Sequence, residues 1–237
     1  MTVAPSRSPV PDNIRRFRDD LERECIRLGR NRDEITIVAV SKTFPPDAVT
    51  SAAECGIGHF GESRVQEAKE KLPLVAVIPK PTWHLVGHLQ TNKAKDAVAL
   101  FDVIQSVDSW HIADEINRRA SVLGKRQDVL LQVNTSGEDQ KSGCDPWDVD
   151  ELIEDIAPME HIRITGLMTI GPLTDDEEDV SSAFRDLRTT FDRLKSSDLR
   201  AGQMIHCSMG MSDDWRIALA EGANMLRIGR AIFGERK

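Results

Sequence analysis

The chain has 237 residues, of which 40% are hydrophobic and 30% charged, and its formal net charge is −8. The length suits one barrel-sized domain or two small ones, and the composition is that of an ordinary globular protein. The acidic balance argues against nucleic acid as a partner, because phosphate backbones are bound by a basic face.

Several kinds of segment are absent from the sequence. No apolar run approaches the ~18 residues that a membrane-spanning helix needs, so no membrane contact is expected. Residues 1–10 are rich in proline and serine and lack the apolar core of a secretory signal, which predicts a flexible tail and a cytoplasmic protein. The four cysteines and six histidines show no metal-ligand spacing, so we expect reduced thiols and no metal site. The chain contains no tyrosine, which excludes any mechanism that needs this chain to supply one.

The first predicted elements are a helix and a strand. Apolar residues recur at spacings of three and four over residues 12–29, with Asp12 as the helix N-cap and Gly29 as its stop. Residues 35–40 (Ile-Thr-Ile-Val-Ala-Val) have neither a helical period nor polar alternation, which indicates a strand buried on both faces. Two prolines at 45 and 46 end it, so Lys42 is expected near the carboxyl end of the first strand.

Strands and helices then alternate along the chain. Further strands are predicted over residues 59–63, 82–87, 103–107, 128–134, 162–170, 204–209 and 225–228. Further helices are predicted over residues 46–54, 65–72, 91–99, 109–123, 146–156, 175–194 and 212–221. Eight strands in such an alternation favour a single α/β domain over residues 11–237, a (β/α)8 TIM barrel with an extra N-terminal helix. An open doubly wound sheet is the alternative.

Polar and small residues collect where the predicted strands end, and in a barrel those ends share one rim. Taken alone, Lys42 is either a solvated rim charge or an amine whose pKa is lowered by desolvation, which would make it a nucleophile for carbonyls. Glycine-bearing turns follow the seventh and eighth strands, at residues 208–212 and 228–234. They either only reverse the chain or hold a phosphate with their backbone amides.

A phosphate site beside an aldehyde-seeking lysine suits pyridoxal 5′-phosphate (PLP), and equally a sugar phosphate in a Schiff-base aldolase with Glu62 as acid or base. Arg227 shares a strand face with Gly229, so its side chain is expected in the same mouth. A guanidinium only donates hydrogen bonds, which would keep a pyridine nitrogen unprotonated. The other interpretation of Arg227 is an ion pair across the barrel, for example with Glu62.

Eight motifs occur in one order along the chain: AVSKT at 39–43, FGE at 60–62, WHLVGHLQTNK at 83–93, QVN at 132–134, KSG at 141–143, GLM at 166–168, SMGMSDD at 208–214 and RIG at 227–229. With these motifs the chain resembles the YggS/PROSC family of pyridoxal phosphate homeostasis proteins, over residues 35–234. The resemblance implies a fold-type III barrel, like the N-terminal domain of alanine racemase.

The resemblance also implies a set of PLP-binding residues. Lys42 would hold PLP as a Schiff base, Arg227 would face the pyridine nitrogen, Asn134 and Met168 would line the ring, Glu62 and His88 would line the rim, and Ser208 with the backbone of Met209, Gly229 and Arg230 would bind the phosphate. The sequence departs from the family at Ser63, where asparagine is frequent, and at Arg230, where a small residue is frequent. A further hypothesis makes Lys141 a transient acceptor of PLP.

The function implied by the resemblance is to buffer PLP and deliver it to apo-enzymes, with no catalytic residues. The alternative is a weakly active PLP-dependent racemase. Racemisation needs two bases on opposite faces of the α-carbon, and in fold-type III racemases the second is a tyrosine, while a C-terminal β domain builds the dimer. This chain has no tyrosine and ends shortly after the eighth predicted strand, so we expect a monomer without efficient racemase activity.

Overall fold

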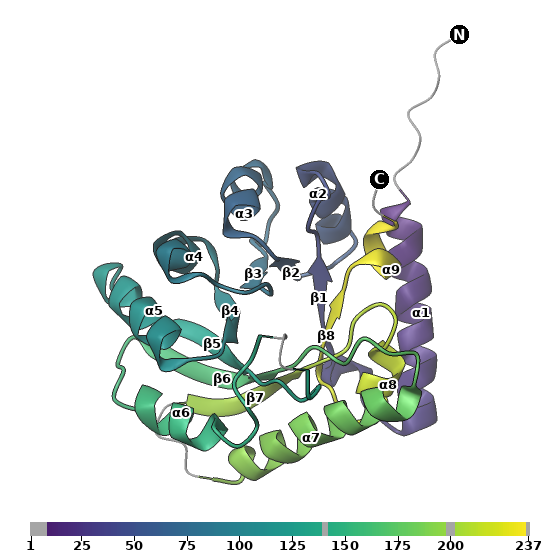
Figure 1. Ribbon diagram of the computed structural model, residues 1–237. Coiled ribbons are helices and arrows are strands. Elements are labelled where there is room, and N and C mark those ends of the chain that lie inside the picture. Colours follow the sequence, from purple (N-terminus) through teal and green to yellow (C-terminus); the bar gives the residue numbers. More distant parts are fainter. Residues whose placement is uncertain (1–8, 139–141, 198–201, 236–237) are drawn as a thin grey trace.

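The first strand pairs with the last, so the sheet closes on itself. In the computed structural model, which describes residues 9–138, 142–197 and 202–235, eight parallel strands form a barrel in strict chain order. Helices surround this barrel on the outside (Figure 1). The predicted (β/α)8 barrel is therefore confirmed, and the open doubly wound sheet is excluded. The predicted tail lies largely outside the described residues, and so does Lys141.

The elements have the following bounds. The strands are β1 Thr36–Val40, β2 His59–Glu62, β3 Thr82–Leu85, β4 Val103–Val107, β5 Gln127–Gln132, β6 Ile162–Met168, β7 Gly202–Ser208 and β8 Met225–Ile228. The α-helices are α1 Val10–Leu28, α2 Pro46–Glu54, α3 Val65–Lys71, α4 Ala94–Leu100, α5 Trp110–Val122, α6 Val149–Ile156, α7 Glu177–Lys195, α8 Trp215–Ala220 and α9 Arg230–Phe233. Short 3-10 turns are η1 Arg32–Glu34, η2 Leu72–Leu74 and η3 Thr91–Lys93.

Helix α1 is the extra N-terminal helix that the sequence predicts. It begins at Val10, two residues earlier than expected, because Val10 is itself buried at the start of the apolar stripe. The stripe packs against α2, α8 and α9, and Phe17 meets Trp215 edge to face at 5.3 Å. Gly29 ends the helix in the left-handed region, at φ +64°, as its predicted role requires.

The strands separate two apolar cores. Residues such as Ala39 and Phe60 point outward and join the large core under the helices. Their strand neighbours alternate to the other face, and five of these from five different strands contact one another: Val38, Val103, Leu130, Met168 and Met225. Contact among non-adjacent strands is possible only inside the barrel, so this second cluster is the barrel interior.

Several boundaries differ from the prediction. Helix α6 begins at Val149 instead of 146, and α8 begins at Trp215 instead of 212. Helix α7 begins at Glu177 instead of 175, its N-cap Asp176 accepts from the Glu178 amide, and the Thr174 hydroxyl accepts from the Asp176 amide. In each case turns ahead of the helix use residues that the sequence pattern assigns to the first helical turn. No helix in the described part of the chain is long and apolar enough to cross a membrane.

Candidate functional site

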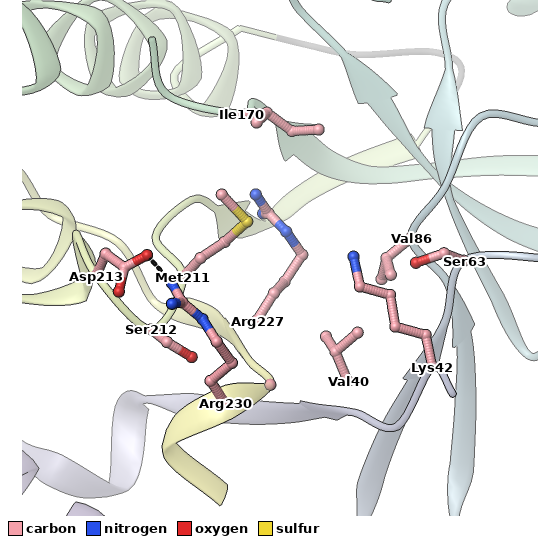
Figure 2. A pocket seen from close by; sticks show the side chains of 11 residues that line it. Val40, Lys42, Ser63, Val86, Ile170, Met211, Ser212, Asp213, Arg227 and Arg230 are labelled. Atoms are coloured by element: carbon pink, nitrogen blue, oxygen red, sulfur yellow. Dashed lines mark hydrogen bonds and ion pairs between the residues drawn. The ribbon is translucent and has the colours of Figure 1, made fainter. Parts of the chain in front are cut away.

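A cavity of about 220 Å³ opens at the carboxyl ends of β1 and β8, where the strand ends form one rim (Figure 2). It is lined by Val40, Lys42, Ser63, Val86, Ile170, Met211, Ser212, Asp213, Arg227, Gly229 and Arg230. Three of these side chains are cationic and one is acidic. A protein of net charge −8 thus keeps a locally positive cavity, which suits an anionic ligand.

Lys42 follows β1, and its side chain projects into the cavity (Figure 2). It sits in a tight turn, because the amide of Phe44 donates to the carbonyl of Ser41 at 3.0 Å. The next residue, Thr43, has φ +70°, the left-handed region that β-branched residues avoid. The backbone around Lys42 is therefore held in a costly conformation.

Arg227 points into the barrel from β8 and is only 4% exposed. Its two terminal nitrogens donate to Ser208 Oγ at 2.8 Å and to the Thr169 carbonyl at 2.6 Å. Burial lowers the pKa of Arg227 to about 10, so the guanidinium stays charged at neutral pH. The alternative interpretation, an ion pair between Arg227 and Glu62, is wrong, because the Glu62 carboxylate is bound by other side chains.

A chain of hydrogen bonds runs from Arg227 down the barrel interior. The Ser208 hydroxyl donates to Gln105 Oε1 at 2.7 Å, and the Gln105 amide NH2 faces His84 Nδ1 at 2.9 Å. His84 Nε2 lies 3.0 Å from His59 Nδ1. Burial, the largest cause, and the neighbouring His59 and His206 lower the pKa of His84 to about 3, so it is neutral at pH 7.

Ser212 faces the cavity beside the turn that leaves β8. Its hydroxyl accepts from the Ala231 amide at 3.3 Å, and the adjoining Asp213 carboxylate accepts a hydrogen bond from Arg230. The preceding Gly210 has φ +91°, and a Cβ there would lie 2.5 Å from the Ala218 Cβ, so only glycine allows this turn. The two turns predicted to hold a phosphate therefore do meet.

The structure brings four of the eight predicted cofactor residues to the cavity: Lys42, Arg227, Gly229 and Arg230. Among the described residues, the other four do not line it. Met168 lies in the barrel interior, Met209 in the outer core, Ser208 beneath Arg227, and Asn134 bonds to the Glu138 carbonyl.

The two rim residues also lie elsewhere. His88 is exposed, with Nδ1 3.6 Å from an Asp108 carboxylate oxygen. Glu62 is fully buried on the helix-facing side of β2, where its carboxylate meets Lys71 at 2.8 Å. Ser212 is a cavity residue that the sequence does not predict, although its motif is noticed, because the pattern indicates the serine cap at the start of a helix. No group of histidine, cysteine and acidic side chains in the described residues is arranged to hold a metal.

The fold and the site define a class: a (β/α)8 barrel with a lysine after its first strand and a cationic cavity at its mouth. The model of the alanine racemase N-terminal domain family matches residues 19–237. A pyridoxal phosphate homeostasis protein from Aquifex aeolicus is 38% identical over 226 residues, which is 95% of this chain and 98% of that protein. This chain belongs to the family of pyridoxal phosphate homeostasis proteins.

Solved structures agree with this assignment. PipY from Synechococcus elongatus PCC7942, solved with PLP bound, superposes with a TM-score of 0.78 at 37% identity, covering 90% of this chain and 99% of PipY. An alanine racemase from Clostridium difficile superposes with a TM-score of 0.68 at 20% identity, covering 92% of this chain and 56% of the racemase. At that identity the racemase shares the fold alone.

Proposed function

We propose that this protein binds PLP in the cavity at the mouth of the barrel and serves PLP homeostasis by holding and releasing the cofactor. The observation that carries the proposal is the donor set: an amine, a buried guanidinium and a hydroxyl beside a second guanidinium meet in one cavity. When bound, PLP supplies an aldehyde that a lysine amine attacks, a pyridine ring and a phosphate dianion.

Five of the lining residues have distinct parts in this proposal. Lys42 provides the amine that anchors the cofactor covalently. Arg227 faces the ring nitrogen as a donor that its own contacts hold in place. The phosphate is bound by Ser212, Arg230 and the backbone of Gly229. Ser208 does not contact the phosphate but acts through Arg227, because its hydroxyl is hydrogen-bonded to Arg227 and Gln105.

The homeostasis role is supported by the names of relatives that align along nearly the whole chain. We propose that no efficient racemase activity accompanies it, in keeping with the lack of tyrosine in the sequence. A cytoplasmic location, a monomeric state and transfer of PLP to apo-enzymes remain predictions, to be tested by fractionation, sedimentation and reconstitution of an apo-enzyme. In the reconstitution, Lys141→Ala tests the separate acceptor hypothesis.

The binding proposal is tested by adding PLP to the purified protein and recording the visible absorption, followed by borohydride reduction and peptide mapping. We expect a visible band that reduction removes, with the label on Lys42 and no label in Lys42→Ala. Lys95→Ala, a change at an exposed lysine of α4, is the matched control and should behave as wild type. A wild-type protein that takes up no PLP refutes the proposal, and a racemase assay on the loaded protein tests the alternative.

A further inference from the structure

The turn that carries Lys42 is held from behind by three charged side chains, Glu62, Glu67 and Lys71, which we call the turn clamp. Lys71 ends α3 and its side chain is only 6% exposed. Its ammonium lies 2.8 Å from each of three acceptors: the Ser41 carbonyl, Glu62 Oε1 and Glu67 Oε1. An ammonium has three hydrogens to donate, so all of them are used.

The two carboxylates of the turn clamp accept hydrogen bonds from the residues on either side of Lys42. Glu62 Oε1 accepts from the Ser41 hydroxyl at 2.6 Å, and Glu67 Oε1 accepts from the Thr43 amide at 2.5 Å. The residue before Lys42 is thus fixed by its carbonyl and its side chain, and the residue after it by its backbone N–H. Each of these bonds ends on Lys71 or on a carboxylate that Lys71 binds.

The clamp opposes a strain in the backbone. Thr43 has φ +70°, and the third position of such a turn favours glycine when φ is positive. A threonine persists there only where its surroundings over-determine the conformation. The turn clamp supplies that constraint, since without it the chain would gain by rotating Thr43 to a negative φ, which would redirect Lys42.

Burying the charged side chains of the turn clamp costs free energy, which argues against a role in stabilising the fold. Desolvation raises the pKa of Glu62 even though Lys71 and Ser41 donate to it, and Glu62 Oε2 has no hydrogen-bond partner among the described residues. Around Glu67, burial acts to raise the pKa, but the hydrogen bonds from Lys71 and the Thr43 amide outweigh it and lower the pKa. Buried ion pairs of this kind often add little stability over apolar residues of the same volume.

We propose that the turn clamp positions Lys42 for its carbonyl ligand, with Lys71 as the positioning residue that holds the strained turn. This inference rests on the proposed function, because it concerns how Lys42 is presented to PLP. Lys71 lies on the helix-facing side of the strands and is absent from the cavity lining, so it acts through the turn.

A rescue experiment separates positioning from a general role in folding. Lys71→Met removes the hub of the clamp, and Thr43→Gly removes the strain that the clamp opposes. We expect Lys71→Met to weaken PLP binding about tenfold, which corresponds to ~1.4 kcal/mol, and the double variant Lys71→Met/Thr43→Gly to recover most of that loss. Thr43→Gly alone should bind as wild type, because glycine adopts this φ readily.

The readouts are the PLP dissociation constant from the visible band, the rate at which the band forms, and the urea midpoint of each variant. Lys69→Met is the matched control, since this exposed lysine of the same helix directs its ammonium to Asp96. A purely structural role for Lys71 predicts a lowered urea midpoint and PLP binding that Thr43→Gly does not restore; that result overturns the inference.

Two further outcomes are distinguishable. If Lys71→Met does not fold, Glu67→Ala takes its place, because Glu67 is partly exposed and its loss removes the acceptor of the Thr43 amide and one partner of Lys71, while Lys71 keeps its bonds to Glu62 and the Ser41 carbonyl. The same loss and the same rescue by Thr43→Gly are expected, and their absence overturns the inference. If wild type fails to bind PLP at Lys42, the proposed function itself fails, which the wild-type and Lys42→Ala arms show before any clamp variant is compared.

Discussion

The buried histidine His84 makes a quantitative prediction about acid stability. Its pKa is about 3 in the fold, against a value of 6.5 in the unfolded chain. A base with a depressed folded pKa takes up its proton more readily when unfolded, so its contribution to stability is complete above pH 6.5 and declines as pH falls. Each pKa unit corresponds to 1.36 kcal/mol, so His84 alone should cost about 3 kcal/mol by pH 4.5 and about 4 kcal/mol by pH 3, where the folded imidazole is half protonated.

The assay is urea unfolding at several pH values between 7.5 and 4.5, comparing wild type with His84→Asn. The asparagine keeps a hydrogen-bonding group toward Gln105 but cannot titrate, so the variant should be less stable at pH 7.5 and should lose about 3 kcal/mol less on acidification. Burial also lowers the pKa values of His59 and His206, so a residual slope remains in the variant. Equal slopes for both proteins would refute the reasoning, because His84 would then have the same pKa folded and unfolded.

Three further predictions concern packing and the interior contacts. Ser208→Ala leaves one terminal nitrogen of Arg227 buried without its acceptor, so we expect a loss of about 1–3 kcal/mol in unfolding free energy and weaker PLP binding, measured by urea titration and by the visible band. Gly166→Ala places a Cβ 1.9 Å from the His206 carbonyl oxygen, so this variant should lose more than ~3 kcal/mol or fail to give soluble protein. Phe60→Ala empties a fully buried site between β2 and the helices and should cost about 3–5 kcal/mol by the same titration, whereas a change below ~1 kcal/mol would contradict the packing described.

The strands of this fold are predictable because their burial leaves a local signal. The run in β1 is apolar on both faces, and eight such segments alternating with helices have few ways to pack. The same geometry explains why Lys42, Arg227 and Gly229 could be assigned to one site, since the ends of parallel strands share a rim. Exact helix starts such as Val149 depend on which turn precedes them, and residue patterns specify that poorly.

The differences between the predicted and the observed positions of Glu62 and Ser208 come from strand faces. Glu62 lies two residues after the outward-facing Phe60, so period-two alternation places its side chain toward the helices. On the next helix, Glu67 and Lys71 form an i,i+4 pair, and this Lys71 is also the partner of Glu62. Ser208 follows the outward-facing Cys207 and therefore points inward, to Arg227. What no pattern shows is the contact of Lys71 with the turn at Ser41, because a bond across 30 positions depends on how α3 packs beside the end of β1.

The hydrogen-bonded chain beneath Arg227 has a single direction. A guanidinium can only donate, so Ser208 must pass its own hydrogen to Gln105, and the Gln105 amide, which also donates to Met225 Sδ, must donate to His84. His84 then carries its proton on Nε2 and donates a hydrogen bond to His59 Nδ1. Reversing any single link would leave two donors or two acceptors facing each other, so the hydrogen-bonded chain in the barrel interior has one consistent arrangement. It fixes the protons in place and keeps the positive charge of Arg227 at the mouth, an arrangement suited to holding a cofactor in one protonation state.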